Sequence, residues 1–117
     1  VARRDTKEKQ VMSMDNLDSH IVDLLSAIQN NLFDRAQQFR TAMTTEVTTW
    51  EEFVDVLDNK TGFVSAHWDG TPETEEKIKE LTKATIRCIP LNNKLEAGKC
   101  ILTGNPSTQR VLFARAY

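Results

Sequence analysis

The sequence predicts an α+β protein, in which a long helix precedes a small two-layer α/β domain with an antiparallel or mixed sheet. One observation is a continuous apolar stripe at helical spacing, which places the long helix over residues 15–45. A second is the β-α-β-β-β order of the elements that close the chain, because a helix between two strands, followed by a tight hairpin, is typical of two packed layers. A third is the length of 117 residues, which suits one compact domain with at most a fragment of another.

The stripe of residues 15–45 is the strongest helical pattern in the sequence. Its apolar side chains recur at spacings of three and four, on a helix of about seven turns. Asp15 is a suitable N-cap, and Asp18 adds negative charge to the first turn. We expect the stripe to lie in a core; its members are Leu17, Ile21, Leu24, Leu25, Ile28, Leu32, Ala36, Phe39 and Met43.

The C-terminal part predicts alternating elements. A helix should begin after Thr49, because Thr49 and Glu52 have the spacing of a capping box, and it should end near Asn59 and Lys60. Pro72 suits the first position of a further helix. The remaining elements are a strand over 62–68, a turn over 69–72, a helix over 73–83, and strands over 85–89, 99–103 and 110–116, the last two joined by 104–107.

The charges are unevenly distributed along the chain. Residues 10–83 hold six basic and fourteen acidic side chains, whereas residues 84–117 hold five basic and one acidic, and residues 1–9 hold four and two. Such asymmetry is compatible with a surface that faces nucleic acid or another domain, and equally with solvated helices beside a basic sheet. The apolar fraction of 39% and the net charge of −2 argue against a disordered protein.

No sequence motif of catalysis or phosphate binding is present, since Walker A, Gly-x-Gly-x-x-Gly and Gly-x-Ser-x-Gly patterns are all missing. His20 lies beside the apolar stripe and is interpreted as a surface residue. His67 lies at a strand end and is interpreted as structural, with a base or a ligand as the alternative. Cys88 and Cys100 lack the short local pairs that a zinc site needs, so spacing alone predicts no zinc.

The composition also bears on location. No apolar run approaches the roughly 20 residues that span a bilayer, and no apolar segment follows the basic N-terminus as in a signal peptide. We therefore expect a cytoplasmic protein with two reduced thiols and no membrane partner. Because the chain begins with Val1 and not Met, we also expect it to be part of something longer or to have been processed.

The last fifty residues carry a resemblance to a known family. Segments 68–75, 78–90, 98–106 and 110–117 follow one another in order and end in Tyr117. They resemble the C-terminal domain of archaeal/eukaryotic-type prolyl-tRNA synthetases, a form also found in many bacteria. Upstream, Arg3, Arg4 and Lys9 resemble the end of that enzyme's anticodon-binding domain. The resemblance thus divides the chain into the end of the anticodon-binding domain (1–14), a connecting helix (15–45) and the C-terminal domain (46–117).

The resemblance also marks a former metal site. Zinc-containing members bind the metal through four cysteines, whose positions correspond to Asp69, Thr74, Cys100 and Thr103 here. Threonine is a poor zinc ligand, so we expect no zinc in this chain. Packing and hydrogen bonds must then tie the turn after Trp68 to residues 100–104. A hydrogen bond between Asp69 and Thr103 is one hypothesis.

For function, the resemblance implies a fragment of a class II synthetase that makes prolyl-tRNA(Pro) from proline, ATP with Mg²⁺, and tRNA. The parent is expected to be a homodimer, and the rest of the synthetase is the expected partner of this fragment. No catalytic residue and no cofactor are expected within it, although the family's terminal tyrosine carboxylate projects toward the active site, which assigns that role to Tyr117. The fragment would thus serve as an accessory module.

Basic residues leave an alternative open. Arg3, Arg4, Arg110 and Arg115 are the candidates for contacts with tRNA, or they are solvated positions. A free-standing RNA-binding module is the alternative function, although the strands lack the interleaved aromatic and basic residues of a base-stacking sheet. A salt-dependent gel shift with tRNA distinguishes the two.

Overall fold

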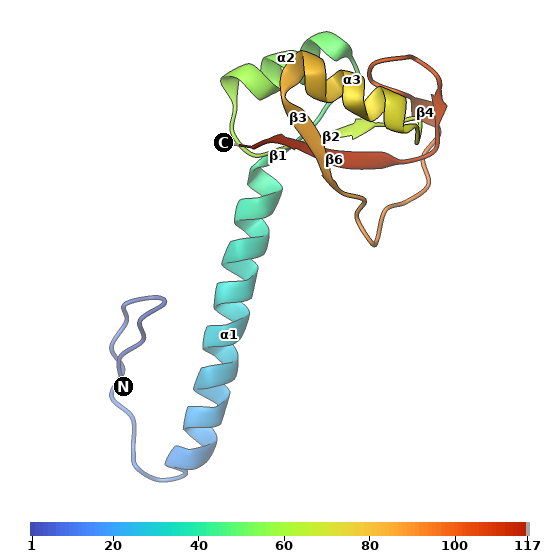
Figure 1. The fold of residues 1–117 in the computed structure, drawn as a ribbon. Helices are drawn as coiled ribbons and strands as arrows, with labels where there is room; N and C mark the ends of the chain where they lie inside the picture. Colours follow the sequence, from blue (N-terminus) through green and yellow to red (C-terminus); the bar gives the residue numbers. More distant parts are fainter. Residues whose placement is uncertain (117) are drawn as a thin grey trace. The chain divides into compact units, whose positions relative to one another are not determined.

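The computed structural model describes residues 1–116, so the role predicted for Tyr117 lies outside the described residues. The chain forms two compact units, Val1–Thr41 and Ala42–Tyr117. Figure 1 shows the elements of each unit in chain order. The two units are described separately below.

The first unit consists of an N-terminal segment and helix α1 (Leu17–Ala42). The segment folds back on itself through an isolated antiparallel bridge between Ala2 and Lys9. Asp5 attaches this segment to the helix, because its Oδ2 accepts a hydrogen bond of 2.6 Å from Asn31.

Helix α1 corrects two expectations about residues 15–45. It begins at Leu17 and ends at Ala42, and residues 44–46 form a strand instead of a last helical turn. None of its residues is buried, and Leu25 and Phe39 are 61% and 67% exposed. The prediction that the stripe lies in a core is therefore wrong for the described residues. An apolar stripe identifies the side that needs a partner, but the partner need not belong to the same 117 residues.

The second unit is built on a four-stranded mixed sheet, as predicted. Its strands are β1 (Thr44–Glu46), β2 (Phe63–His67), β3 (Ala84–Cys88) and β6 (Arg110–Arg115), in the order β1-β2-β6-β3. Strand β1 pairs with β2 in parallel, whereas β6 lies antiparallel to both β2 and β3. The central strands β2 and β6 are thereby buried between neighbours, and Val64 faces Phe113 across them.

Helices α2 (Trp50–Asn59) and α3 (Pro72–Thr82) lie on the same side of this sheet, which gives the two layers (Figure 1). Phe53 from α2 and Ile78 from α3 are fully buried against Val64 and Phe113. The rings of Phe53 and Phe113 meet edge to face with centroids 5.1 Å apart. This apolar layer is the core of the unit, and it fixes the strand ends from which the polar side chains of the site project.

The starts of both helices agree with their sequence signals. Thr49 caps α2 in a full capping box with Glu52, and Pro72 occupies the first turn of α3. The N-cap of α3 is Thr71, whose hydroxyl accepts a hydrogen bond from the backbone N–H of Thr74. This cap belongs to the same turn as Asp69, so the start of helix α3 and the side chain of Asp69 share hydrogen bonds.

The predicted hairpin of 99–103 and 110–116 is wrong. Residues 98–99 form the short strand β4 (Gly98–Lys99), which pairs with β5 (Pro106–Ser107) in a separate two-stranded sheet. Residues 101–103 form a turn, and β6 pairs with β2 and β3. The backbone N–H of Ile101 donates to the carbonyl oxygen of His67, so this small sheet is attached to the end of β2.

Candidate functional site

The turn after β2 is organised around the carboxylate of Asp69. Oδ1 accepts hydrogen bonds from the backbone N–H and the hydroxyl of Thr71, at 3.2 and 2.9 Å. Oδ2 accepts from the hydroxyls of Thr74 and Thr103, at 3.0 and 2.9 Å. The hypothesis of a hydrogen bond between Asp69 and Thr103 is therefore confirmed, and we call Asp69, Thr71, Thr74 and Thr103 the Asp69 cluster.

The Asp69 cluster joins segments that are distant in sequence. Asp69 and Thr74 flank the start of α3, whereas Thr103 lies in the turn of residues 101–103. Cys100, the fourth of the corresponding positions, begins this second turn, where its carbonyl oxygen accepts from the N–H of Gly104. One carboxylate thus holds together the two loops that four cysteines hold in the zinc-containing pattern.

The electrostatics of the cluster favour an ionised carboxylate. Partial burial opposes ionisation of Asp69, but hydrogen bonds from Thr71, Thr103 and Thr74 outweigh it and lower its pKa to about 2. Both carboxylate oxygens therefore act as acceptors at neutral pH. The threonine hydroxyls each place their one proton on an acceptor, as Thr71 and Thr74 do toward Asp69.

Zinc does not fit the side chains at these positions. A structural zinc site needs four sulfur, nitrogen or carboxylate ligands, and this set offers one carboxylate and one thiol beside two threonines. The oxygens of Asp69 are already occupied by hydroxyl and amide donors. Within the described part of the chain, no three His, Cys, Asp or Glu side chains gather closely enough to hold a metal ion. Cys88 is exposed, Cys100 is buried, and both are free thiols.

A second polar cluster surrounds the other end of the same small sheet, and sequence reasoning missed it. Glu96 Oε1 lies 3.3 Å from His67 Nε2 and 3.3 Å from Arg110 Nε. On the other side of the imidazole, Nδ1 lies 3.1 Å from the hydroxyl of Ser107, which donates to the carbonyl oxygen of Trp68 at 2.7 Å. Hydrogen bonding to His67, and then to Arg110, lowers the pKa of Glu96.

This second cluster is structural in its geometry. His67 is buried, and both of its ring nitrogens have protein partners, which favours the structural interpretation of His67 over a base or a ligand. The guanidinium of Arg110 donates to the carbonyl oxygens of Val47 and Ser65, at 2.9 and 3.2 Å, and so ties β6 to the residues around β1 and β2. A cavity of about 270 Å³ lies beside these side chains, but their polar atoms already serve the fold.

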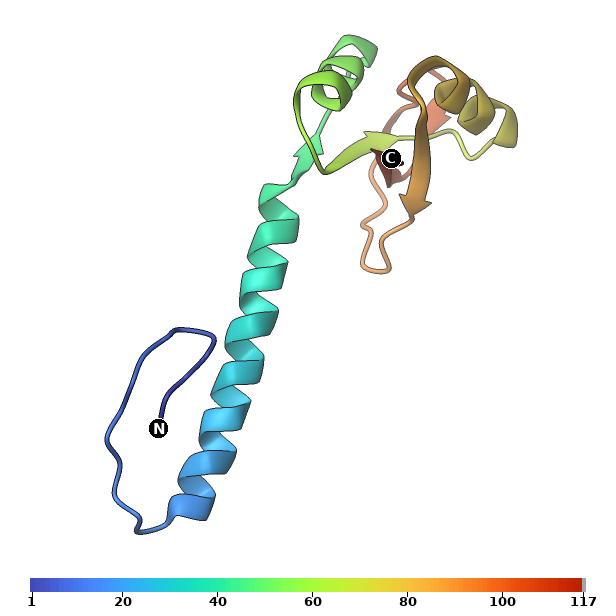
Figure 2. The ribbon, with the colours of Figure 1, turned by 60° about the vertical axis from the view of Figure 1, so that its left-hand side comes forward.

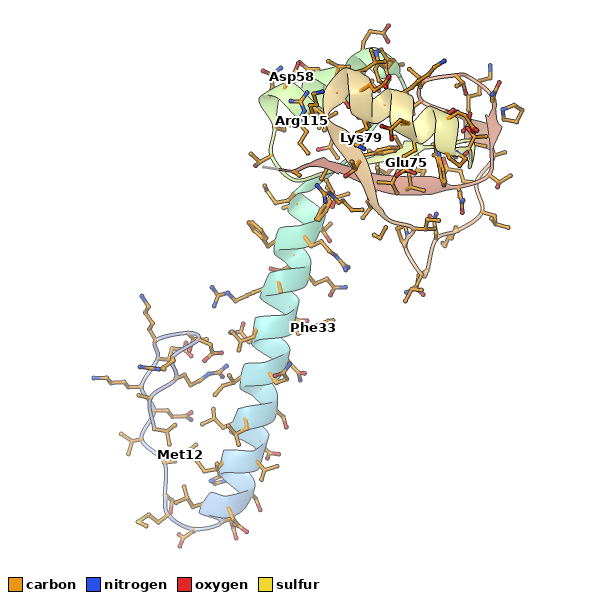
Figure 3. The ribbon with its side chains drawn as sticks, in the orientation of Figure 1. Met12, Phe33, Asp58, Glu75, Lys79 and Arg115 are labelled. Carbon is orange, nitrogen blue, oxygen red and sulfur yellow. The ribbon has the colours of Figure 1, made fainter. Side chains whose placement is uncertain are left out.

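Arg115 has a similar role at the opposite end of β6. Its guanidinium donates to the carbonyl oxygen of Thr82, at 2.6 Å, and of Leu57, at 2.8 Å. Both carbonyls belong to the last turns of helices, α3 and α2, where backbone acceptors lack partners and positive charge is favourable. Figure 3 shows Arg115 beside Asp58, and the two form an ion pair of 2.7 Å. Arg115 thus caps both helices at once.

Removing this double cap should measurably destabilise the second unit. We expect Arg115→Met to lower the free energy of unfolding by about 1–2 kcal/mol, because two charged hydrogen bonds to helix-end carbonyls are lost while the apolar stem remains. Chemical denaturation of the chain measures it. The matched control is Arg87→Met on β3, whose contact with Ala114 is long at 3.5 Å and whose loss should cost less than about 0.5 kcal/mol. Equal effects of the two substitutions would contradict the capping role.

The family model described as prolyl-tRNA synthetase, C-terminal, matches residues 50–117, which is more than half of the chain. The chain belongs to this family. The proline–tRNA ligase of Flavobacterium psychrophilum is 61% identical over 117 residues, and that of Flavobacterium johnsoniae is 58% identical. The proline–tRNA ligase of Porphyromonas gingivalis is 52% identical.

Each of these three matches covers the whole of this chain but 24% of the relative. The chain therefore spans about a quarter of the length of the curated relatives it matches. The resemblance of residues 68–117 to the prolyl-tRNA synthetase C-terminal domain is confirmed by the family match. A helix with the length and apolar content of a membrane span does not occur among residues 1–116.

The four arginines proposed for nucleic acid occupy different settings in this prolyl-tRNA synthetase domain and its preceding segment. Arg110 and Arg115 donate to backbone carbonyls as described above. Arg3 pairs with Asp5 through two contacts, of 2.6 and 3.1 Å, and this pairing is the largest cause of the lowered pKa of Asp5. Arg4 is exposed. Contacts of these arginines with tRNA stay a prediction.

Proposed function

We propose that this chain is the C-terminal part of a proline–tRNA ligase, which makes prolyl-tRNA(Pro) from proline, ATP and tRNA. The observation that carries the proposal is the match of all 117 residues to proteins named proline–tRNA ligase at 52–61% identity. ATP, with Mg²⁺, and the proline pocket would belong to the remaining part of the synthetase, in a cytoplasmic and homodimeric enzyme. The family's zinc is not part of the proposal, because the Asp69 cluster does not suit the metal.

Within that enzyme, the second unit would act as an accessory module that braces the synthetase. Its hydrogen bonds support this role, because they stiffen the unit at three places. The Asp69 cluster joins two loops, Arg110 joins β6 to Val47 and Ser65, and Arg115 joins β6 to both helix ends. A module of this kind contributes position and not chemistry, so the fragment alone should not aminoacylate.

The terminal carboxylate of Tyr117 is the one group that the proposal directs to the parent active site. The support for it is that Arg115, two positions earlier, is held in place. Its guanidinium contacts Thr82, Leu57 and Asp58, so the last strand is anchored just before the chain end. A carboxylate that follows an anchored strand can accept charge-assisted hydrogen bonds and orient a cationic or polar group.

The test is proline-dependent ATP–pyrophosphate exchange by the full-length parent. The proposal predicts that the parent catalyses the exchange and charges tRNA(Pro). Deletion of Tyr117 should lower the exchange rate by roughly tenfold or more, which corresponds to about 1.4 kcal/mol of transition-state stabilisation. The control Tyr117→Phe keeps the terminal carboxylate and should retain most of the rate. An unchanged rate after deletion would leave the module a brace alone, and a parent without exchange activity would contradict the proposed function.

A further inference from the structure

The connection between β3 and β4, residues 89–97, exposes three large apolar side chains. Its apolar side chains point outward: Leu91 is fully exposed, Leu95 is 84% exposed and Ile89 is 48% exposed. Two of its polar side chains contact β6, namely the half-buried amide of Asn93 and the carboxylate of Glu96, which is 53% exposed. Surface loops normally keep large apolar side chains at least partly out of water, and this loop does not. We call this connection the 89–97 loop.

The 89–97 loop is held in this arrangement by several hydrogen bonds. Asn93 Nδ2 donates to the carbonyl oxygen of Arg110 at 2.6 Å, and the backbone N–H of Asn93 closes a turn onto Pro90 at 3.1 Å. The backbone N–H of Glu96 donates to the carbonyl oxygen of Thr108 at 2.9 Å. Its carboxylate contacts His67 and Arg110, and any Cβ on the neighbouring Gly98 would collide with the His67 ring. The outward leucines are therefore presented by an anchored backbone.

Figures 1 and 2 show the 89–97 loop projecting from the sheet on the side away from α2 and α3. It lies outside the core that Phe53, Ile78 and Phe113 form, and its leucines take no part in that core. Exposed apolar side chains on a fixed backbone are typical of a surface that another protein segment covers. Leu91 and Leu95 bury almost no surface within the second unit and so add no packing stability to it. A contact outside the unit would bury them.

We propose that the 89–97 loop is the docking surface for the part of the synthetase that lies outside these 117 residues, with Leu91 and Leu95 as its apolar anchors. The inference rests on the proposed function. The occupant follows from length: the curated relatives are about four times as long as this chain, so roughly three quarters of the parent lies beyond it. The loop is thus the point where the rigid second unit contacts the remainder of the enzyme.

Cysteine labelling of the full-length parent and of the 117-residue chain tests the proposal. Leu91→Cys and Leu95→Cys are introduced separately in a Cys88→Ser background, because Cys88 is itself exposed. The matched control is Leu81→Cys on α3, whose side chain is 66% exposed. We expect both loop cysteines to react with maleimide roughly tenfold more slowly in the parent than in the chain, relative to the ratio at residue 81. Ratios at 91 and 95 no larger than at 81 would overturn the proposal.

A second measurement needs no substitution, and it decides the matter where a cysteine variant fails to fold. Amide hydrogen exchange over residues 89–97 should be slower in the unsubstituted parent than in the unsubstituted chain. Equal exchange in both would overturn the proposal. Protection that appears only as the parent's concentration rises would also overturn it, since the occupant would then be a second copy. Charging of tRNA(Pro) by the same parent is measured in parallel: an active parent with an unprotected loop defeats this inference alone, whereas a protected loop in an inactive parent defeats the proposed function.

Discussion

Replacing Asp69 with alanine is expected to lower the free energy of unfolding of the second unit by about 2–3 kcal/mol. The substitution removes the acceptor of Thr71, Thr74 and Thr103 in one step. It also disconnects the turn after β2 from the turn of residues 101–103, which no other side chain of the Asp69 cluster spans. Water can reach part of the site, and this keeps the expected cost below the sum of the separate hydrogen bonds.

Urea denaturation, followed by circular dichroism, measures this effect. Glu80→Ala on α3 is the matched control, because it removes an exposed carboxylate from the same unit and should change the free energy of unfolding by less than about 0.5 kcal/mol. Asp69→Asn keeps the shape of the side chain and one acceptor oxygen, so its loss of unfolding free energy should lie between those of Asp69→Ala and Glu80→Ala. An Asp69→Ala protein as stable as the control would mean that the threonine-lined turn holds itself together.

The carboxylate of Asp69 also predicts how stability depends on pH. Its pKa is lowered from 3.8 to about 2 in the folded chain, so the folded state favours the ionised form. A lowered pKa contributes stability that is fully present above the unfolded value and is lost as the pH falls through the folded value. The stability difference between the wild-type chain and Asp69→Asn should therefore be constant above about pH 4 and should shrink between about pH 4 and pH 2. A difference that stays constant down to pH 2 would contradict the assignment.

Gly98→Ala is expected to destabilise the second unit by about 2–4 kcal/mol. A Cβ at residue 98 would collide with His67 Nε2 and would lie 2.6 Å from two carbons of the same ring. The ring cannot retreat without losing its contacts with Ser107 and Glu96, because it is buried between them. Either the imidazole leaves its place or β4 moves away from β2.

A rescue experiment separates this steric cause from a destabilising effect of alanine that does not depend on the His67 ring. In a His67→Ala background the ring is gone, so Gly98→Ala should then cost less than about 1 kcal/mol. Gly104→Ala is the control for backbone conformation alone, because its φ is +72° and no atom lies within 4 Å of its Cβ position. A Gly98→Ala cost that persists without the His67 ring would show that the close approach is not the cause.

The elements that the sequence predicted well carry local signals. The capping box of Thr49 and Glu52, Pro72 at a helix start, and the apolar pattern of 110–116 each depend on residues a few positions apart. The hydrogen bond between Asp69 and Thr103 was also predictable, because the zinc pattern of the family places the loops that carry these two positions side by side. The residue types at these positions, a carboxylate among hydroxyls, then favour hydrogen bonds over zinc binding.

The features that the sequence did not predict depend on distant partners. Strand β1 is three residues long and exists because β2 offers it an open edge, which no pattern within 44–46 reveals. Residues 99–103 hold a short apolar run that is typical of a strand, but the backbone hydrogen bond of Ile101 to His67 belongs to a turn there. Glu96 reaches His67 across 29 positions and appears in sequence as an ordinary loop carboxylate. The exposure of the apolar stripe of α1 was not predicted either, because a stripe is buried only where a second surface packs against it, and the stripe itself does not say whether that surface is present.

The central claim is that hydrogen bonds of the Asp69 cluster, and not a metal, hold this prolyl-tRNA synthetase C-terminal domain together. The most direct test is the zinc content of the purified chain, with its thermal unfolding recorded with and without a strong chelator. The account predicts substoichiometric zinc and the same midpoint of unfolding in both conditions. One zinc ion per chain, together with a lower midpoint in the presence of chelator, would contradict it.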